Sequence, residues 1–453
     1  MKQHSLSKIA CSLVLLTAAV FVAPVGLAQD KGQGTTGAKA GNGCAPDNGG
    51  LTLPPGFCAS VFADNLGRAR HLTVAPSGDV YVNTWSSSYT ELKNAAGGYL
   101  VALRDSNRDG KADRVERFGP VHQDGKAGGG TGIAVHRDAL LVEDNGKIVR
   151  YRLGSGALVP QANPEVILSG LWTERGHIMH PFAITADGVM YVNSGSVTNS
   201  CQEKDRTLES PGLSPCSEVQ SHAGIWRYDA SKVGQAFSPA ERYATGTRNV
   251  VALAVNEDGA LYATLHGRDN LAAHWPKLYT VAQNNELPAE VFARINKGDD
   301  FGWPQCYFDG TQRKHVLAPE YGGDGGKTQG ACAQKAQPIL TFPAHWAPNG
   351  MTFYSGTAFP AKYRGGAFVT FHGSHDRSPK QAGYLVAFVP FEAAKAAGRF
   401  EEFATGFPGA EAPAAPTAAD HRPMGVAVGP DGALYVSDDV KGRVWRIAYS
   451  GGA

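Results

Sequence analysis

The sequence predicts an all-β protein folded as a six-bladed β-propeller, with four-stranded antiparallel blades and insertions in the rim loops. One hairpin pattern recurs six times along the chain. The turns inside the repeated hairpins contain Asp and Gly, the residues that tight hairpins need. The composition agrees, because 56 glycines and 27 prolines beside 42% hydrophobic residues are typical of a turn-dense β protein with a real core.

Each copy of the repeat consists of an alternating strand, a short turn and a second alternating strand. The six copies begin at Leu72, Ile133, Phe182, Leu253, Met351 and Val426. Their starts are 61, 49, 71, 98 and 75 residues apart, which leaves room in each repeat for four strands and an insertion. A β-sandwich also has alternating strands, but it would not repeat one hairpin along most of the chain.

The chain divides into three parts. Residues 1–28 are expected to be a cleaved signal peptide, because two lysines precede an apolar run and a small-residue cleavage region. A membrane anchor is the alternative, although about 17 apolar residues lie at the lower limit for crossing a bilayer. Residues 29–50 are expected to be a flexible lead-in and residues 51–453 the catalytic propeller. The mature protein is therefore expected to be periplasmic or secreted, without a membrane span.

The cysteines predict disulfides. Cys11 leaves with the signal, and six others remain in an oxidising compartment. They form three pairs that are local in sequence: Cys44 with Cys58, Cys201 with Cys216, and Cys306 with Cys332. Spacing alone leaves other pairings open. No CxxC or CxxCH motif occurs, which argues against a covalently attached haem and a four-thiolate zinc site.

Charge and motifs exclude several function classes. The formal charge of +1 falls to about −1 once two lysines leave with the signal, and the basic residues are scattered, so nucleic acid is not the expected partner. The sequence contains no GxSxG elbow, P-loop, HExxH motif or dinucleotide fingerprint. Serine hydrolase, nucleotide-binding and zinc-protease functions therefore lack support.

Some segments depart from the repeat. Short helices are predicted at Glu286–Arg294, Lys362–Tyr363 and Glu392–Ala397. The long stretch between the fourth and fifth copies contains Cys306 and Cys332, and it is expected to be a disulfide-pinned insertion at the rim. Rim loops of this kind shape the site over the central channel of a propeller.

Candidate catalytic residues lie at the edges of the repeated hairpins. His177 stands just before the third copy, where a neutral imidazole can take a proton from a substrate hydroxyl. His180 on the same loop is a competing candidate. Either histidine could instead have a purely structural role.

Basic and imidazole residues recur at the other hairpin edges at similar offsets, together with neighbouring Asn, Asp and Trp side chains. They are Arg248, Asn249, His266, Arg268 and Asp269 around the fourth copy, His345, Trp346, His372, His375 and Arg377 around the fifth, and Arg422 before the sixth. Guanidinium groups at a channel mouth suit a polycarboxylate ligand, and an indole can stack on a flat cofactor or a sugar ring. The alternative is a set of rim salt bridges and ordinary packing between blades.

A possible calcium loop lies between the first and second copies. Asp105, Asn107, Asp109 and Asp113 alternate around Gly110, and Glu116 stands at the twelfth position of the loop. Oxygen-rich loops with this spacing bind Ca²⁺, although flanking helices are not predicted here. A solvated hairpin turn is the other interpretation.

Five blocks of the chain resemble one known family. GHIMHPFAITADGVMYVNSGS, TGTRNVVALAVNEDGALYATLHGRD, KGDDFGWP, AHWAPNGMTFYSGTAFPAKYRGGAFVTFHGS and RPMGVAVGPDGALYVSDD resemble blocks of the glucose and sorbosone dehydrogenases, in the family's order. The resemblance runs from about residue 50 to the C-terminus. It implies a six-bladed propeller that binds pyrroloquinoline quinone and calcium at the channel mouth and oxidises sugars or sugar aldehydes.

The resemblance also implies roles for individual residues. His177 matches the general base, Arg248 and Asn249 match a pair near quinone and substrate, and Arg422 matches an arginine on the quinone carboxylates. Gly267 and Arg268 match the loop whose main-chain carbonyls bind calcium. By position, Arg268, His372 and Arg377 are further candidates for the cofactor, and His345 and Trp346 for the substrate.

Two positions depart from the family pattern. Met424 stands where soluble glucose dehydrogenases carry a second arginine, and His375 stands where sorbosone-type members carry tryptophan. The expected reaction passes a hydride to the quinone while His177 takes the hydroxyl proton, and electrons leave to an external cytochrome or quinone. A calcium-dependent lactonase and a non-catalytic carbohydrate- or protein-binding propeller are the alternatives.

Overall fold

A computed structural model describes residues 43–86, 97–121, 128–392, 395–409 and 412–451. The expected signal peptide and residues 29–42 of the expected lead-in lie outside this part. Residues 43–50 lie within it and are attached to strand β1 (Phe57–Ala63), since Ala45 N–H donates to Ala59 O over 2.8 Å and Asn48 Oδ1 accepts from Ala59 N–H. Among the described residues, no helix has the length and apolarity needed to cross a bilayer.

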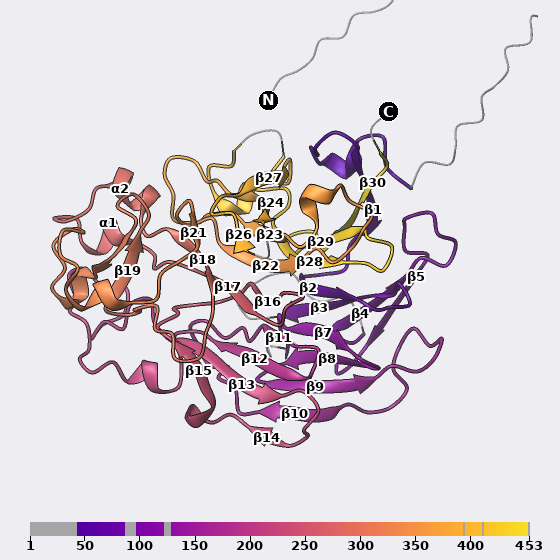
Figure 1. Ribbon diagram of the computed structural model, residues 1–453, viewed down its shortest axis with the longest axis horizontal. Coiled ribbons are helices and arrows are strands. Elements are labelled where there is room, and N and C mark those ends of the chain that lie inside the picture. Colours follow the sequence, from indigo (N-terminus) through magenta and orange to yellow (C-terminus); the bar gives the residue numbers. More distant parts are fainter. Residues whose placement is uncertain (1–42, 87–96, 122–127, 393–394, 410–411, 452–453) are drawn as a thin grey trace, which may run out of the picture. The chain divides into compact units, whose positions relative to one another are not determined.

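The described chain forms six antiparallel blades in a ring (Figure 1). Each blade is given from its inner strand outward. Blades one to three are β2 (Ala69–Val74), β3 (Val80–Ser86), β4 (Leu100–Arg104), β5 (Arg114–Phe118); β7 (Ile133–His136), β8 (Ala139–Asp144), β9 (Lys147–Arg152), β10 (Glu165–Ser169); and β11 (Phe182–Ile184), β12 (Val189–Ser194), β13 (Gly224–Asp229), β15 (Arg242–Thr245). Blades four to six are β16 (Leu253–Val255), β17 (Leu261–Leu265), β18 (Glu290–Arg294), β21 (Leu340–Phe342); β22 (Pro348–Phe353), β23 (Ala367–His372), β24 (Tyr384–Val389), β27 (Glu401–Ala404); and β28 (Pro423–Val428), β29 (Leu434–Asp438), β30 (Val444–Tyr449), β1.

The six predicted repeats are confirmed as the inner hairpins of the six blades. Every predicted start falls within the first strand of its blade, from Leu72 in β2 to Val426 in β28. The ring is closed by the N-terminal strand β1, which pairs antiparallel with the C-terminal strand β30, from Phe57 opposite Tyr449 to Ala63 opposite Val444. Figure 1 shows these two strands side by side, indigo next to yellow. This closure joins residues nearly 400 positions apart, which no local pattern indicates.

Short strands and helices are added to the six blades. β6 (Gly128–Gly129) pairs with β3, and β14 (Gln235–Ala236) adds a parallel strand to β10. The described helices are α1 (Leu271–His274), α2 (Val281–Glu286) and seven 3-10 turns: η1 (Asn48–Gly50), η2 (Ser217–Gln220), η3 (Pro239–Glu241), η4 (Pro319–Tyr321), η5 (Gly330–Gln334), η6 (Ala361–Tyr363) and η7 (Pro416–Ala418).

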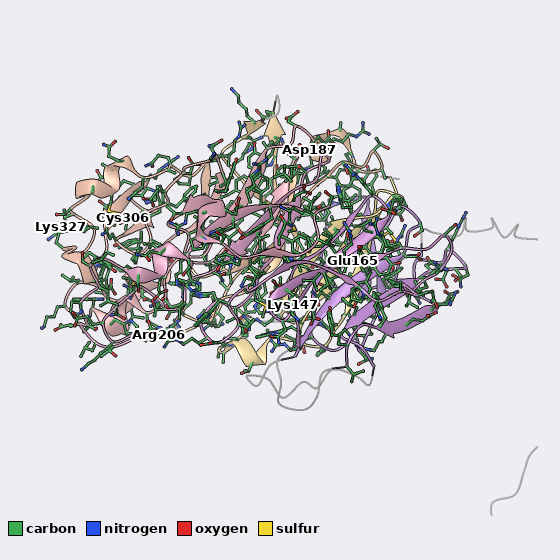
Figure 2. The ribbon with its side chains drawn as sticks, turned by 90° about the horizontal axis from the view of Figure 1, so that it is seen from below. Lys147, Glu165, Asp187, Arg206, Cys306 and Lys327 are labelled. Atoms are coloured by element: carbon green, nitrogen blue, oxygen red, sulfur yellow. A yellow bond between two sulfur atoms is a disulfide. The ribbon has the colours of Figure 1, made fainter. Side chains whose placement is uncertain are left out.

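The insertion predicted between the fourth and fifth repeats is present. It contains the hairpin of β19 (Cys306–Asp309) and β20 (Lys314–Leu317). Figure 2 places Cys306 and Lys327 together in this insertion, away from Lys147 and Glu165 of blade two. The three predicted disulfides, 44–58, 201–216 and 306–332, are all formed.

Two of the three predicted helices are wrong. Glu286 ends α2, and the segment then continues to β18, because the adjacent Val291 and Phe292 point to opposite faces of the strand and both are buried. In the predicted helix 392–397, residues 393–394 lie outside the described part, Glu392 ends β25 (Phe391–Glu392), and β26 (Lys395–Ala396) pairs antiparallel with β25. The third predicted helix falls within the 3-10 turn η6.

Aromatic side chains fill the space between blades five and six. Phe57 of β1 packs edge-on against Phe359, Phe403 and Tyr363, with ring centroids 4.7, 5.0 and 5.3 Å away. Edge-to-face pairs of this kind add to the free energy of burial. The closing strand therefore carries a large part of the packing between blades five and six.

We expect Phe57→Ala to lower the free energy of unfolding by about 3–5 kcal/mol, because it leaves a cavity among rings that cannot collapse into it. Urea denaturation measures the change. Val233→Ala, at a side chain that is 50% exposed, is the control and should change stability by less than about 0.5 kcal/mol. Equal effects of the two substitutions would contradict the closing role of β1.

Candidate functional site

One cavity of about 920 Å³, counting the space at its mouth, opens at the end of the ring where the inner strands begin. It is lined by residues from all blades except the second. They are Arg70, Trp85, Gly176, His177, Ile178, Met179, Arg248, Asn249, Val251, His266, Gly267, Asp269, Glu290, His345, Ala347, Asn349, His372, His375 and Arg422. Most of the residues singled out from the sequence therefore meet here.

His177 is held by the loop that follows β12. Its Nδ1 lies 2.8 Å from the carbonyl oxygen of Ser196 and 3.0 Å from the Ser196 hydroxyl. A carbonyl only accepts hydrogen bonds, so Nδ1 carries the ring proton and Nε2 is left as the basic atom. Burial, followed by the nearby charge of Arg248, lowers the pKa of His177 to about 3. The ring is therefore neutral near pH 7.

A glycine allows this arrangement. A Cβ at Gly195 would lie 2.5 Å from the Cβ of His177 and 3.0 Å from Oδ1 of Asn249. Any side chain at this position would push the two cavity residues apart. The backbone at Gly195 thus lets His177 and Asn249 approach each other.

His180, the competing candidate for the base, lies in the core beneath the cavity. It is fully buried and does not line the cavity. Its Nδ1 lies 3.1 Å from Glu143 Oε1, and Glu143 also accepts hydrogen bonds from the backbone N–H groups of Thr131 and Gly132. This buried pair supports the loop that carries His177.

The guanidinium group of Arg248 donates three hydrogen bonds within the protein. Its Nε donates to Asn199 O, its Nη1 to Gly267 O and its Nη2 to Asp269 Oδ2, over 3.1, 2.9 and 2.8 Å. Burial alone would raise the pKa of the Asp269 carboxyl. The nearby positive charge of Arg248 outweighs burial and is the main cause that holds this pKa well below its usual range. The neighbouring Asn249 is 7% exposed, and its Oδ1 is buried without a partner among the described residues. That oxygen is free for a ligand.

A second group of basic residues lies across the cavity. Arg422 donates from Nε to His372 O and from Nη2 to Gly373 O, over 2.8 and 2.9 Å. Asp439 accepts from Arg70 Nη1 over 2.6 Å, and its other oxygen lies 2.7 Å from His372 Nε2. Burial, followed by Arg422, lowers the pKa of His372 to about 4, so it is neutral and donates to Asp439. Arg68 also contacts Asp439, over 3.5 Å, and the charge of Asp438 acts on Arg422. Three guanidinium groups thus face two carboxylates, which leaves an excess of positive charge.

Sequence reasoning missed Arg70. It lies on β2, two residues before the first repeat, much as Arg422 precedes the sixth, so the recurrence of basic residues at hairpin edges could have found it. Arg70 is 7% exposed and lies over the ring of Trp85, 5.6 Å from its centroid. Its Nη2 donates to no described residue. Sequence reasoning also missed Trp85, Glu290 and Asn349, all of which line the cavity.

Met424 is buried completely. Its sulfur lies 3.2 Å from Asn349 Nδ2 and its carbonyl accepts from Thr370 Oγ1. The next residue, Gly425, packs on β2, since a Cβ there would lie 2.8 Å from Arg70 O. The strand that carries Arg70 thus lies against the position where the family pattern has its second arginine.

Three predicted site residues are not brought to the cavity. Arg268 pairs with the buried Glu320, and Arg377 donates to Ala344 O and pairs with Glu286. Trp346 packs against Phe371, with ring centroids 5.6 Å apart. Their side chains point into the blade-four insertion or the core, where tertiary contacts outweigh the sequence position. His345 does line the cavity, but its Nε2 lies 2.7 Å from Asn284 O and 3.1 Å from Leu287 O.

Oxygen atoms near Gly267 are the candidates for holding a cation. The Gly267 carbonyl accepts from Arg248, and the Gly267 N–H donates to Glu290 Oε2 over 3.1 Å. Burial raises the pKa of Glu290 to about 8, and the neighbouring Asp269 adds to the rise. A buried carboxyl beside a second one is an environment that a divalent cation would stabilise.

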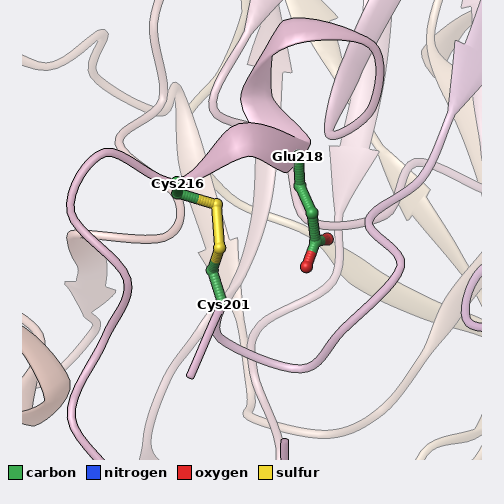
Figure 3. Close-up of side chains that lie close together, drawn as sticks. All are labelled: Cys201, Cys216 and Glu218. Carbon is green, nitrogen blue, oxygen red and sulfur yellow. A yellow bond between two sulfur atoms is a disulfide. The ribbon is translucent and has the colours of Figure 1, made fainter. Parts of the chain in front are cut away.

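Two other clusters have metal-ligating residue types within the described part of the chain. The first is Cys201, Cys216 and Glu218, in which the sulfurs form a disulfide and are not available as thiolates (Figure 3). The second is Asp269, His345 and Asp376, in which His345 Nε2 lies 2.7 and 3.1 Å from two carbonyl oxygens and therefore carries the ring proton, which leaves only Nδ1 with a lone pair.

The predicted calcium loop lies between β4 and β5. Its acidic side chains accept hydrogen bonds from the loop's own backbone: Asp105 from Asp109 and Gly110, Asp109 from Lys111, and Asp113 from Ser106. Glu116 pairs with Arg114. Calcium binding by this loop stays a prediction.

The buried histidines predict how stability depends on pH. Burial is the main cause that lowers the pKa of His71, His266 and His372 to about 4, and of His177 to about 3. These values lie below the pKa of about 6.5 in the unfolded chain, so the contribution of neutral histidine is full above pH 6.5 and is lost as the pH falls toward 4.

We therefore expect the free energy of unfolding to fall between pH 6.5 and 4, by up to about 1.4 kcal/mol per pH unit for each histidine. Urea titrations over this range measure the slope. The slope should be shallower in His71→Asn, because one fewer proton is taken up on unfolding. Identical slopes in the two proteins would contradict the prediction.

Comparison with known proteins agrees with the fold. The Trichoderma reesei carbohydrate-active enzyme of family AA12 is 16% identical, with a TM-score of 0.69 over 88% of this chain and 98% of that one. The pyrroloquinoline quinone domain of Coprinopsis cinerea pyranose dehydrogenase is 20% identical, with a TM-score of 0.67 over 88% and 97%. The quinone-bound aldose sugar dehydrogenase of Streptomyces coelicolor is 18% identical, with a TM-score of 0.51 over 88% and 99%. The resemblance to sugar dehydrogenases noted in the sequence is thereby confirmed.

A curated relative, an uncharacterised protein of Borreliella burgdorferi, is 26% identical over 212 residues, which are 46% of this chain. The match spans about half the length of that relative, 49%. The TrAA12-like family matches residues 51–450, almost the whole described propeller. The chain belongs to the TrAA12-like family.

Proposed function

We propose that this protein is a quinoprotein dehydrogenase that oxidises a sugar or a sugar aldehyde, with pyrroloquinoline quinone as cofactor. One observation carries the proposal: a neutral histidine with a basic Nε2 and two arginines with surplus positive charge line the same cavity. Membership of the TrAA12-like family and the fold shared with sugar dehydrogenases support it.

The cavity suits a flat polycarboxylate. Arg70 and Arg422 would hold its carboxylates through charge-assisted hydrogen bonds, for which Arg70 Nη2 is free of described partners. The orphaned Oδ1 of Asn249 and of Asn349 would accept from the ligand. Calcium would bind at the main-chain carbonyls of Gly267 and Arg268, beside the carboxyl of Glu290.

When bound, the quinone accepts a hydride equivalent from the substrate carbon. The chain's own contribution is to take the hydroxyl proton at His177 Nε2, while Nδ1 keeps its proton and donates it in a hydrogen bond to the Ser196 carbonyl oxygen. The imidazole ring of His177 becomes positive when it takes this proton. The Ser196 carbonyl and the charge of Asp269 stabilise the positive ring, since both raise the pKa of His177.

The hydrolase alternative needs carboxylates that are free to hold a catalytic cation. Asp269 is instead paired with Arg248 and Arg206 over 2.8 and 2.9 Å. This pairing favours the dehydrogenase. A periplasmic or secreted location, and an external cytochrome or quinone as electron acceptor, belong to the same proposal.

The experiment is to load the purified protein with pyrroloquinoline quinone and Ca²⁺, then follow dye reduction with a panel of aldoses and sugar aldehydes. Quinone binding is measured separately by absorbance and by quenching of tryptophan fluorescence, because Trp85 lines the cavity. We expect binding and turnover with at least one sugar. Absence of quinone binding, or lactone hydrolysis without quinone, would contradict the proposal.

A further inference from the structure

The loop behind His177 supports several residues of the cavity. Segment 196–201 supplies Ser196 to His177, as described above. Asn199 accepts from Arg248 Nε through its carbonyl, and its side chain forms two 3.0 Å hydrogen bonds with the backbone of Asp269. A shift of this segment would therefore displace the base and the Arg248–Asp269 pair together.

Glu218 of η2 binds this segment directly. Its Oε2 accepts from the backbone N–H groups of Val197 and Thr198 over 2.7 and 3.1 Å, and its Oε1 accepts from Thr198 Oγ1 over 2.6 Å. Thr198 O in turn accepts from Ser196 Oγ over 2.6 Å. A carboxylate that accepts three hydrogen bonds can fix two successive peptide units. The chain of contacts runs from Glu218 through Thr198 and Ser196 to His177.

The Cys201–Cys216 disulfide places Glu218 beside the segment. Cys201 ends the segment and Cys216 immediately precedes η2, so the bond ties the two together, with Glu218 reaching across (Figure 3). Both cysteines are buried. Without the bond, the intervening residues 202–215 would form the only covalent link between Glu218 and its partners, and ordering them would cost conformational entropy.

We propose that Glu218, held in place by this disulfide, is a positioning residue that fixes the Nδ1–H tautomer of His177. If the Ser196 carbonyl moves away, the proton redistributes between the two ring nitrogens, and a ring protonated at Nε2 cannot take the substrate proton there. The effect on turnover rests on the proposed function. The effect on the tautomer does not.

The tautomer is measured in the ligand-free protein by ¹⁵N NMR of labelled histidine, with the His177 signals assigned by their loss in His177→Gln. In the wild type we expect Nδ1 to be protonated and Nε2 not. In Glu218→Ala we expect a mixture of the two tautomers, and in Glu218→Gln, which keeps one acceptor oxygen, a smaller change. Glu165→Ala is the matched control, because Glu165 pairs with Arg150 on blade two, away from the segment. It should leave the His177 signals unchanged.

The same variants are then loaded with quinone. Turnover should fall by about 10-fold or more in Glu218→Ala, a fraction of what a positioned base contributes, with the quinone dissociation constant within about 2-fold of wild type. The double variant Cys201→Ser/Cys216→Ser should behave like Glu218→Ala, whereas Cys44→Ser/Cys58→Ser should keep wild-type signals. A cooperative thermal transition shows that each variant is folded.

An unchanged His177 tautomer in both Glu218 variants would overturn the inference. A shifted tautomer in a protein that oxidises no sugar would uphold it and overturn the proposed function instead. The two failures are therefore distinguishable.

Discussion

Replacing His177 by Ala should lower turnover of the quinone-loaded protein by about 100-fold or more, because it removes the only group that accepts the hydroxyl proton in the proposed reaction. Quinone binding should change little, since in the proposed function Arg70 and Arg422, on the opposite side of the cavity, would hold the carboxylates. Dye-reduction kinetics give kcat and KM, and fluorescence quenching gives the dissociation constant of the quinone. The loss should appear in kcat.

His180→Ala tests the specificity of this result. His180 is fully buried against Glu143 and does not reach the cavity, so its loss should reduce stability and leave most of the turnover of the folded protein. A His177→Ala protein that keeps wild-type turnover would remove His177 as the base. Equal losses of kcat in both variants, at equal stability, would mean that the loop as a whole and not His177 is responsible.

Replacing Arg70 by Gln should weaken quinone binding by about 10- to 100-fold, the effect of losing a charge-assisted hydrogen bond worth about 1.5–3 kcal/mol. Arg70 lines the cavity, and in the proposed function it would take the place of the arginine that Met424 replaces. Arg422→Gln should have an effect of similar size. Titrations with the quinone and with its trimethyl ester measure the part that depends on the carboxylates.

Arg68→Gln is the matched control for Arg70→Gln. Arg68 contacts the same Asp439 oxygen over 3.5 Å and lies over the same Trp85, but it does not line the cavity. It should bind the quinone nearly as wild type does. Discrimination between quinone and ester should fall in Arg70→Gln and persist in Arg68→Gln, and the reverse result would contradict the assignment.

The sequence predicts the inner hairpins of the six blades correctly, but two of its three predicted helices are wrong. The inner hairpins were recognisable because period-two alternation and Asp-Gly turns act within about 20 residues, so local composition decides them. The residues of segment 286–294 suit either a helix or a strand, so local composition predicts a helix there. Residues 290–294 form a strand because they pair with β17 and β21. Tertiary contacts outweighed propensity there.

The site was predicted in part for the same reason. His177, Arg248, Asn249, His372 and Arg422 stand at the edges of recognisable hairpins and do meet in one cavity. Arg268 and Trp346 stand at equally suggestive positions, yet each side chain turns toward its own buried partners. Sequence position places a residue at a blade edge, but packing determines the direction of its side chain.

What the sequence by itself determined is the repeat, because the alternation and the turn of each hairpin depend on neighbours close along the chain. It favoured the three local cysteine pairs without excluding others, and it placed only part of the cavity lining at hairpin edges. Only the tertiary structure decided how the ring closes, since β1 and β30 come from opposite ends of the propeller. Only the tertiary structure brought Arg70 beside Met424 and Glu218 behind His177. These are contacts between segments distant in sequence, and their geometry exists only once the blades have packed against one another.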